Sequence, residues 1–387
     1  MTRDDAHRWM EHAVGLARRG AGRVSPGALV GCVLVGPGGE LWGEGWYGTW
    51  GGSHAEVWAV RDAERRGFGD RLGQATAVVT LEPCAHWGKT PPCANLLVER
   101  GIRRAIVAHL DPFPEVAGRG VEILRAAGAE VTLGVGERAA RRMNAAFLTH
   151  VRTGRPHVTL KVAATLDGQV ATASGDSRWV TDAAARQRVH SMRAEADAVL
   201  VGAGTARADD PGLTVRDVPL AAGQTQPLRV VLDRAAALPP GLRVFTDGAA
   251  PTLRVVAGGQ SATDAVPDGA DGVAMWQIPK TDGHLDLGAL LDRLGSEPVA
   301  GRRVVQSVLV EAGPGLATAM LRTDLVDRLA WFVAPKLVGA GTPATRDLGI
   351  ARMADALGGA DARWETLGDD ALVTLELRES AADADVP

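Results

Sequence analysis

Cysteine is scarce in this chain of 387 residues, which contains only three. Three cysteines allow at most one disulfide bond, so a framework of several disulfides is not expected. An odd number of cysteines, in a chain whose first residues are not followed by a hydrophobic signal segment, predicts the reducing environment of the cytoplasm.

Long hydrophobic runs and a strong charge of one sign are also lacking. No apolar stretch approaches the roughly 20 residues that span a bilayer. The formal net charge is only −4, which does not favour the basic field that nucleic-acid-binding proteins carry. Aromatic residues make up 4% of the chain, so a basic face with aromatic platforms for bases is not expected. These absences favour a soluble enzyme with small-molecule substrates.

The length predicts two domains, because single hydrophobic cores stop growing at roughly 250–300 residues. The polar segment 152–156 contains a glycine and a proline and lies between an expected helix and an expected strand. We place the boundary there and expect domains at residues 1–151 and 152–387.

Hydrophobic periodicity predicts an α/β fold in both domains. In the first we expect helices at 6–19, 54–66, 93–100 and 121–127, and strands at 29–35, 41–47, 78–81, 104–109 and 130–134. In the second we expect strands at 158–163, 198–201, 228–232, 252–256, 307–311 and 329–333, and helices at 182–194 and 315–322. Residues 249–272, rich in glycine, alanine and aspartate, are expected to form a surface excursion, and the tail after residue 379 to fray.

The most informative pattern is an ordered set of metal-ligand residue types. His54 and Glu56 are followed by Cys84 and then by Cys93. One histidine and two cysteines that bind zinc, with a glutamate that is not a ligand, are characteristic of zinc deaminases. Three protein ligands leave a fourth tetrahedral position for water, whose pKa falls to about 7 on the metal. We therefore expect His54, Cys84 and Cys93 as metal ligands and Glu56 as the catalytic acid and base.

The alternative is a structural zinc site or a set of unrelated thiols. A closed structural site needs four protein ligands, commonly two close cysteine pairs. Apart from Cys84 and Cys93, the chain has only Cys32, which lies in the apolar run 29–35, where a small buried thiol is the ordinary expectation. The complete motif favours catalysis, with hydrolytic loss of an exocyclic amine.

Two glycine-containing turns admit two interpretations. Residues 199–205 contain Gly202 and Gly204, the first two glycines of a dinucleotide fingerprint, but lack the third. Residues 308–315 predict a strand that runs into a helix start, where free backbone amides can hold a phosphate. A tight turn from strand to helix, without any ligand, explains each pattern equally well.

Several longer runs occur in one order between about residues 6 and 340. They are LEPCAHWGKTPPC (81–93), LKVAATLDG (160–168), ASGDSRWVT (173–181), ADDPGLTVR (208–216), EAGP (311–314) and APKL (334–337). In these runs the chain resembles the bifunctional deaminase and reductase family of riboflavin biosynthesis.

The resemblance implies a cytidine-deaminase-like α/β/α domain followed by a dihydrofolate-reductase-like α/β domain. It implies Zn²⁺-dependent hydrolytic deamination of a diaminopyrimidinone that bears a ribosylamino phosphate. It then implies NADPH-dependent reduction of the ribosyl group to ribityl phosphate. A cytoplasmic homo-oligomer that binds neither nucleic acid nor membrane is expected.

The resemblance also implies site residues in the second domain. NADPH would be contacted by Ala163, Trp179, Thr205, Asp209, Gly313, Pro314, Gly315 and Leu316. Substrate would be contacted by Ser177, Arg193, Leu213, Arg216 and Glu311. Guanidinium groups suit a sugar phosphate because they donate paired hydrogen bonds, although both arginines could instead be solvated surface charges. Lys161 and Asp209 are polar groups expected beside the hydride-transfer site, and Lys161 could equally belong to a structural pair.

The departures from the family pattern lie in the first domain. Gly27 stands where an asparagine is usual, Tyr47 where a histidine is usual, and Phe113 where an asparagine is usual. All three replacements affect polar positions near the expected pocket, and the loss of a buried hydrogen-bonding partner can cost roughly 1–3 kcal/mol of binding. Lys89 is a candidate phosphate contact in the first domain, or a solvated loop lysine.

Three functions therefore compete. The bifunctional enzyme is favoured by two sets of motifs in one chain. A paralogue with altered or lost deaminase specificity and a retained reductase is favoured by Gly27, Tyr47 and Phe113. A nucleic-acid-binding deaminase or a noncatalytic zinc module would require the basic, aromatic face that the composition lacks.

Overall fold

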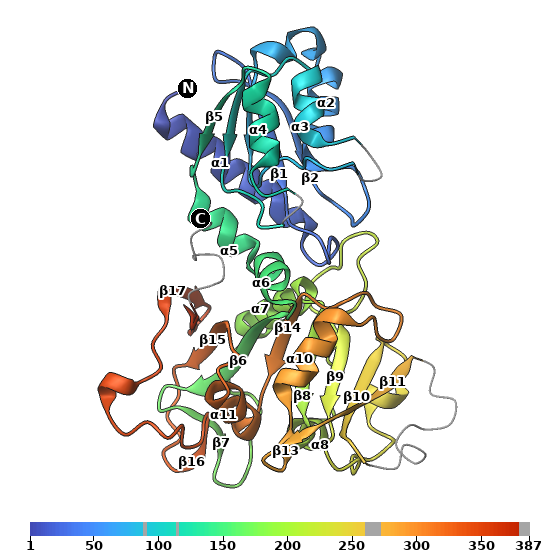
Figure 1. Cartoon of the computed structure of the whole chain (residues 1–387). Coiled ribbons are helices and arrows are strands. Elements are labelled where there is room, and N and C mark those ends of the chain that lie inside the picture. Colours follow the sequence, from blue (N-terminus) through green and yellow to red (C-terminus); the bar gives the residue numbers. More distant parts are fainter. Residues whose placement is uncertain (88–90, 114–115, 260–271, 379–387) are drawn as a thin grey trace. The chain divides into compact units, whose positions relative to one another are not determined.

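The computed structural model of the chain describes residues 1–87, 91–113, 116–259 and 272–378 (Figure 1). These residues fall into two compact units, the first formed by Met1–Thr153 and the second beginning at Gly154. The division lies within two residues of the boundary expected at 151/152, while the exact domain limits 1–151 and 152–387 stay a prediction.

The first unit is built on a five-stranded sheet in the order β2-β1-β3-β4-β5. Strand β1 pairs antiparallel with β2 and β3, whereas β3, β4 and β5 run parallel. The strands are β1 (Gly31–Val35), β2 (Leu41–Trp46), β3 (Thr76–Val79), β4 (Arg104–Val107) and β5 (Glu130–Leu133). The α-helices are α1 (Arg3–Ala17), α2 (Ala55–Arg65), α3 (Cys93–Glu99), α4 (Arg119–Ala126), α5 (Glu137–Met143) and α6 (Ala145–Thr153).

Helices cover both faces of this sheet, because successive side chains of a strand point to opposite faces. Cys32 and Leu34 pack with buried residues of α2, α3 and α4. Val33 and Val35 pack with buried residues of α1 and α5. The first unit is therefore a three-layer α/β/α structure, as expected.

The second unit is built on a nine-stranded sheet in the order β11-β10-β9-β8-β14-β6-β15-β18-β17. Neighbours from β11 to β15 run parallel, and β18 and β17 add an antiparallel edge. The strands are β6 (His157–Thr165), β8 (Ala198–Gly202), β9 (Leu228–Leu232), β10 (Thr252–Ala257), β11 (Val273–Ile278), β14 (Ser307–Glu311), β15 (Arg328–Ala334), β17 (Ala360–Leu367) and β18 (Asp370–Glu376). Two short pairs lie outside it: β7 (Gln169–Thr172) with β16 (Gly341–Pro343), and β12 (Lys280–Thr281) with β13 (His284–Leu285).

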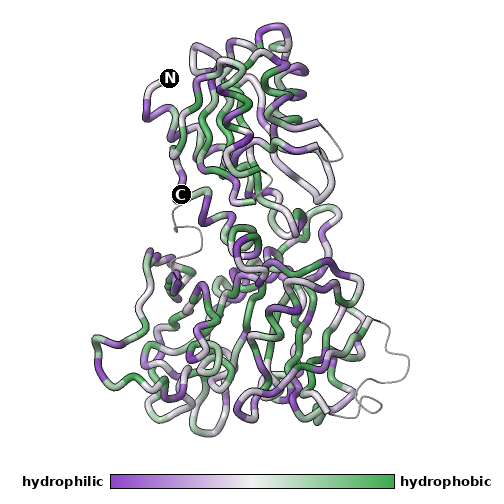
Figure 2. The backbone as a smooth tube through the Cα atoms, in the orientation of Figure 1, coloured by the Kyte–Doolittle hydropathy of each residue, from purple (hydrophilic) through white to green (hydrophobic). Residues whose placement is uncertain are grey.

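Helices again cover the large sheet on both faces. Buried residues of α10 (Leu287–Ser296) and α11 (Pro314–Arg322) pack with Leu160, Leu200 and Val230. On the other face, α8 (Ala203–Asp209) and α9 (Arg243–Thr246) pack with β8 and β9, and α7 (Ala183–Glu195) packs with β15. Figure 2 shows that hydrophobic stretches follow the central strands of each unit.

The helices and strands expected from the sequence are present, with ends that differ by no more than three residues. The sequence patterns missed α5, α8, α9, α10, β11, the edge strands β17 and β18, and the short strands β7, β12, β13 and β16. The expected surface excursion at 249–272 is wrong in part, because it includes β10, which is buried along its whole length. Residues 260–271 and the tail after 379 lie outside the described residues.

Helix α2 lies unusually close to β2, because β2 presents glycines to it. A methyl group added to Gly43 would lie 2.2 Å from the carbonyl oxygen of Ala59. One added to Gly45 would lie 2.4 Å from the carbonyl oxygen of Ala55. Glycine at both positions lets the helix backbone approach the sheet, and this approach determines where the first turn of α2 lies.

We predict that Gly43→Ala destabilises the first unit by about 1–3 kcal/mol, because its methyl group would overlap helix backbone that cannot move aside alone. The matched control is Gly15→Ala in α1, where no atom lies within 4 Å of the added methyl group. Alanine there should stabilise the helix by about 0.5–1 kcal/mol. Urea unfolding would measure both, and an unchanged midpoint for Gly43→Ala would contradict the close packing.

Candidate active sites

Three metal-ligand side chains converge in the first unit. The ligand atoms of His54, Cys84 and Cys93 all lie within 4.8 Å of one another. Nδ1 of His54 lies 3.5 Å from Sγ of Cys84 and 3.3 Å from Sγ of Cys93. Nitrogen and sulfur ligands held tetrahedrally at about 2.0 and 2.3 Å from zinc would lie about 3.5 Å apart. The donor set therefore fits zinc.

This group is open rather than closed. Among the described residues, the set of mutually close ligand atoms contains these three residues and no fourth. A structural zinc site has four protein ligands, whereas a catalytic site has three and leaves one position for water or substrate. The arrangement favours the catalytic interpretation over the structural one.

The secondary structure places each of the three ligands. His54 is the residue immediately before α2, and Cys93 is the first residue of α3, as the sequence predicts. Cys84 lies between β3 and α3, and its sulfur accepts a hydrogen bond of 3.3 Å from the backbone N–H of Cys93. Helix N-termini favour negative charge, which favours a thiolate at the start of α3, whereas the hydrogen bond with Cys84 and burial raise the pKa of the Cys93 thiol.

The surroundings of Cys84 and Glu56 shift the pKa values of these two groups in opposite directions. Hydrogen bonding from Cys93, aided by His54, lowers the pKa of the Cys84 thiol to about 4 despite burial, so this sulfur is a thiolate at neutral pH. Glu56 lies in the first turn of α2 and is only 3% exposed. Burial raises the pKa of its carboxyl group above the ordinary value, which suits a group that both accepts and donates protons.

Of the three departures from the family pattern, Tyr47 packs against a metal ligand and Gly27 lies next to Tyr47. The Tyr47 ring packs edge-on against the His54 ring, with centroids 5.4 Å apart, and the Tyr47 hydroxyl accepts a hydrogen bond of 2.7 Å from the N–H of Gly51. A methyl group added to Gly27 would lie 3.2 Å from Cε1 of Tyr47. Phe113, 38% exposed, packs near His86. Tyr47 thus fills the space into which a larger side chain at position 27 would point.

In the second unit, two turns at the carboxyl ends of neighbouring parallel strands lie side by side. Strands β8 and β14 are paired. A methyl group added to Gly313, just after β14, would lie 3.3 Å from Oγ1 of Thr205 in α8. One added to Gly202 would lie 3.7 Å from Cδ2 of Leu316 in α11. The fold therefore brings together three of the residues expected at NADPH, although Thr205 lies more than one hundred positions before Gly313 and Leu316 along the chain.

The start of α11 fits a phosphate of NADPH. Its N-cap residue is Gly313, Pro314 follows at the first helical position, and no described side chain caps the helix. The backbone N–H groups that begin the helix are thus available to an anion. Both glycine-containing turns do run from strand to helix, and their proximity supports the nucleotide interpretation.

The other residues expected at NADPH lie on three different elements. Ala163 is in β6 and Asp209 is the last residue of α8. Trp179 is 65% exposed, with the guanidinium of Arg186 4.6 Å from its ring. Nζ of Lys336 donates a hydrogen bond of 2.7 Å to the Trp179 carbonyl. Sequence reasoning missed the role of Lys336 in holding this segment, because nothing in a loop lysine reveals its distant partner.

Two residues expected at the substrate are paired with each other. Arg193 and Glu311 are bound through two hydrogen bonds, and Nη1 of Arg193 donates to the Thr214 carbonyl at 2.9 Å. Arg193 is 8% exposed, so it is not a solvated surface charge. Burial alone would raise the pKa of Glu311, but the ion pair with Arg193 outweighs burial and lowers it to about 2.

The other polar and substrate candidates differ in their surroundings. Lys161 is the β6 partner of Glu311 in the sheet, and burial lowers its pKa. Leu213 is buried with a positive φ of 49°, whereas Arg216 and Ser177 are exposed. Lys89 lies outside the described residues. The contacts expected for all these residues stay predictions.

Comparisons with known proteins match both units of the chain. A family model described as the RibD C-terminal domain matches residues 156–373. A model of the cytidine and deoxycytidylate deaminase zinc-binding region matches residues 3–109. Riboflavin biosynthesis protein RibD of Aquifex aeolicus is 37% identical over 373 residues, which cover 96% of this chain and 99% of that protein. The chain belongs to the RibD family.

Other RibD proteins match over similar lengths. The protein of Escherichia coli is 39% identical over 358 residues, covering 90% of this chain and 93% of its own. The crystal structure of a diaminohydroxyphosphoribosylaminopyrimidine deaminase/5-amino-6-(5-phosphoribosylamino)uracil reductase from Thermotoga maritima has a TM-score of 0.82 and 35% identity, covering 97% of this chain and 99% of that one. Acinetobacter baumannii RibD has a TM-score of 0.80 and 37% identity over the same shares.

Membership of the RibD family confirms the expected fold class and function. The protein is a bifunctional deaminase and reductase of riboflavin biosynthesis, whose cofactors are zinc and NADPH. The alternative of a paralogue with altered or lost deaminase specificity is not favoured, because the relatives match across both halves of the chain.

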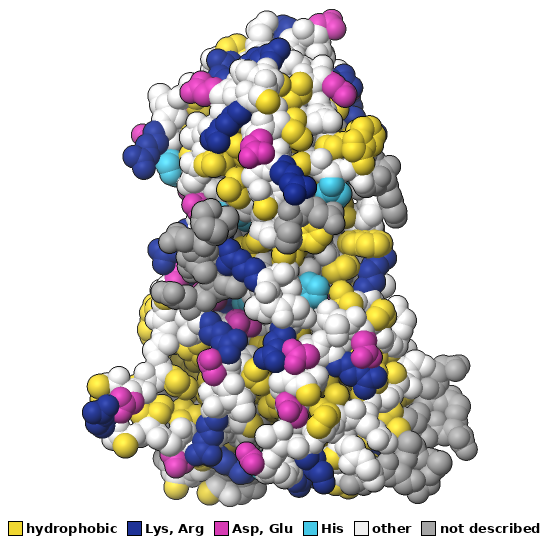
Figure 3. All heavy atoms as spheres, viewed as in Figure 1, with side chains coloured by type: hydrophobic (Ala, Val, Ile, Leu, Met, Phe, Trp, Pro, Cys, Tyr) yellow, Lys and Arg dark blue, Asp and Glu magenta, His cyan; other side chains and the backbone are white. Residues whose placement is uncertain are grey.

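Two further observations concern the basic surface that nucleic-acid binding needs and the long apolar helix that a membrane span needs. On the face shown in Figure 3, Lys and Arg side chains alternate with Asp and Glu, without a broad basic patch. Within the described ranges, no helix is both long enough and apolar enough to cross a membrane. The substrates of this family are small molecules.

We predict that Cys84→Ser abolishes zinc binding, because a neutral hydroxyl cannot replace the thiolate in a three-ligand site. The control is Cys32→Ser, which changes the same residue type in a strand that does not reach the metal ligands. Elemental analysis of the purified proteins should find about one zinc per chain in the parent and in Cys32→Ser. A full equivalent of zinc in Cys84→Ser would overturn the ligand assignment.

Proposed function

We propose that the first unit removes an exocyclic amine from a diaminopyrimidinone that carries a ribosylamino phosphate. The second unit then reduces the ribosyl group of the product to ribityl phosphate with NADPH. The observation that carries this proposal is the open group of His54, Cys84 and Cys93 beside the buried carboxyl group of Glu56, in a chain with a complete reductase unit.

In the first unit, Glu56 is the group that moves protons. Zinc held by the two cysteines and His54 supplies a water molecule that is acidic enough to react at neutral pH. Glu56 lies two residues after His54 in the first turn of α2, close enough to serve the same reacting centre. It takes a proton from the attacking water and delivers it to a ring nitrogen of the pyrimidine, then takes the second proton of that oxygen and delivers it to the amino group, which leaves as ammonia.

In the second unit, the turns that follow β8 and β14 hold NADPH through Thr205, Asp209 and the segment Gly313–Leu316, together with Ala163 and Trp179. NADPH supplies a hydride. Lys161 and Ala163 face the same side of β6, since they are two residues apart in a strand. Glu311, which Arg193 holds in place, lies on β14 and pairs with Lys161 of β6. Both side chains are thus on strands that adjoin the residues proposed to hold NADPH. We assign substrate contacts to Ser177, Arg193, Leu213, Arg216 and Glu311.

We predict that Glu56→Gln lowers ammonia release by about 10²- to 10⁴-fold, because the amide cannot exchange protons. Zinc content should stay unchanged, and so should NADPH oxidation with substrate that is already deaminated. The matched control is Glu64→Gln on the same helix, where the carboxylate pairs with Arg100 at the surface. Ammonia and NADPH would be followed in one reaction.

The outcomes separate the two activities. Parent protein that releases ammonia and then oxidises NADPH establishes both steps and shows that Gly27, Tyr47 and Phe113 are tolerated. Parent protein that oxidises NADPH only with deaminated substrate would contradict the proposed deamination. Normal ammonia release by Glu56→Gln would remove Glu56 from the catalytic role.

We further propose that the enzyme acts in the cytoplasm as a homo-oligomer. Trp364 is 74% exposed on β17, the edge strand of the nine-stranded sheet, and exposed edge strands readily associate with another copy. We predict that light scattering finds an oligomer and that Trp364→Lys shifts it toward the monomer. A monomeric parent protein at micromolar concentration would exclude this proposal.

A further inference from the structure

Two arginine side chains from separate segments meet above Gly212 in the second unit. A methyl group added to Gly212 would lie 3.2 Å from Nη2 of Arg243 and 3.7 Å from Nη1 of Arg216. It would lie 3.5 Å from the hydroxyl oxygen of Thr214. Three hydrogen-bond donors therefore lie within 4 Å of one point beside the Gly212 backbone.

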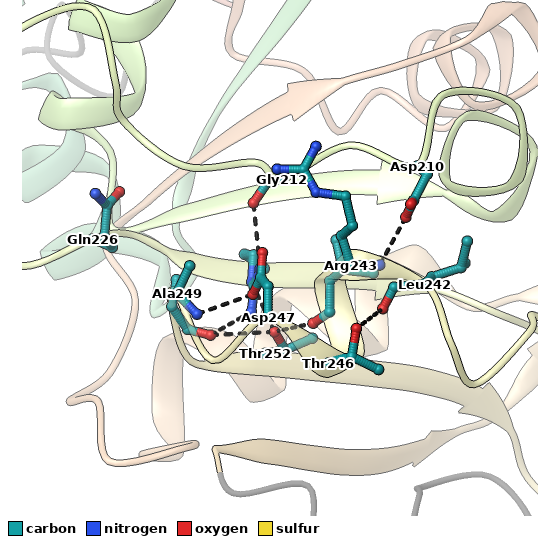
Figure 4. A network of polar contacts seen from close by, with 12 residues as sticks. Asp210, Gly212, Gln226, Leu242, Arg243, Thr246, Asp247, Ala249 and Thr252 are labelled. Atoms are coloured by element: carbon teal, nitrogen blue, oxygen red, sulfur yellow. Dashed lines mark hydrogen bonds and ion pairs between the residues drawn. The ribbon is translucent and has the colours of Figure 1, made fainter.

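Neither guanidinium has a carboxylate partner among the described residues, since no ion pair and no side-chain hydrogen bond joins either to another group. Figure 4 shows the Arg243 side chain extended toward Gly212, with no dashed line at its guanidinium. Two like charges so close together repel each other unless an anion lies between them.

The nearby carboxylates are engaged elsewhere. Asp210 accepts a hydrogen bond of 2.7 Å from the backbone N–H of Arg243, not from its side chain. Asp217 lies 3.2 Å from Nε2 of His190. Asp247 pairs with the buried guanidinium of Arg229 at 2.7 Å. None of these carboxylates neutralises the two arginines above Gly212.

The backbone beside them also offers unused donors. Leu213 has a positive φ of 49°, which turns the chain sharply after Gly212. The backbone N–H groups of Leu213 and Thr214 find no acceptor in the described parts of the chain. Arg229 is only 1% exposed and donates a hydrogen bond of 3.4 Å to the Gly212 carbonyl. This buried guanidinium therefore anchors the turn at Gly212.

We propose that Arg243 is a further substrate-binding residue, which acts with Arg216 to hold the phosphate group of the ribosylamino phosphate above Gly212. This inference rests on the proposed function, and it adds a residue that the sequence patterns did not indicate. Two guanidinium groups match a phosphate monoester, a dianion with several acceptor oxygens. Arg216 belongs to the same segment as Thr214, whose carbonyl binds Arg193, so this phosphate lies toward the Arg193–Glu311 pair.

A phosphate monoester could also come from NADPH, through the phosphate on its adenosine ribose. The experiment must distinguish these two sources. Steady-state reduction would be measured with the deaminated substrate and with the same compound lacking its phosphate, and separately with NADPH and with NADH.

We predict that Arg243→Gln raises the KM for the phosphorylated substrate by about 10- to 100-fold, the loss expected for hydrogen bonds to a charged group. The kcat should stay close to that of the parent enzyme, because the phosphate is bound equally in the ground and transition states. The KM for the dephosphorylated substrate and the preference for NADPH over NADH should not change. Arg243→Lys, which keeps the charge, should recover part of the loss.

Two further variants complete the test. Gly212→Ala places a methyl group at the point nearest all three donors and meets only flexible side-chain ends, so it should fold and should also raise the KM for the phosphorylated substrate. Arg352→Gln removes the same charge from an exposed pair with Asp355 and should leave every parameter unchanged.

Three results would overturn the inference. An unchanged KM in Arg243→Gln would show that Arg243 does not contact the substrate phosphate. An equal rise for phosphorylated and dephosphorylated substrates would indicate a structural role only. A loss confined to the preference for NADPH would assign the site to the cofactor. Parent protein that reduces no deaminated substrate would instead count against the proposed function.

Discussion

The first unit depends on the close approach of helices to the central sheet. Gly43 and Gly45 let α2 lie against β2, and Gly31 allows a similar approach of α1, where an added methyl group would lie 2.0 Å from the Ala13 carbonyl oxygen. Because α2 begins at the metal ligand His54, the packing of a helix against a strand becomes a constraint on the catalytic site. A shift of α2 by a fraction of an ångström would carry His54 and Glu56 with it.

The second unit obtains its site from parallel strand order. The carboxyl ends of parallel neighbours lie at one edge of a sheet, so the turns after β8 and β14 meet there. The same register places Lys161 beside Glu311. Buried charge is tolerated at this edge because it is paired: Arg193 binds Glu311 through two hydrogen bonds. Removing either partner would leave an uncompensated buried charge, which is costly.

The arginines of the second unit illustrate the difference between a charge that stabilises the fold and a charge that is available to a ligand. Arg254 and Asp233 are both about 2% exposed and bind each other, so they satisfy one another inside the core. Arg216 and Arg243 are exposed and lack such a partner among the described residues. Charges of the first kind hold the fold together, whereas charges of the second kind are available to an anionic ligand.

The sequence by itself determined the fold class, the catalytic motif and most helices and strands, because hydrophobic periodicity and the order of His54, Glu56, Cys84 and Cys93 are local properties of the chain. The edge strands β17 and β18 escaped detection because they are half exposed and lack a continuous apolar run. Only the tertiary structure decided which distant groups meet: Arg193 with Glu311, Tyr47 with the space beside Gly27, and Arg243 with Arg216. These contacts depend on strand order and on the direction of each side chain, which no local pattern encodes.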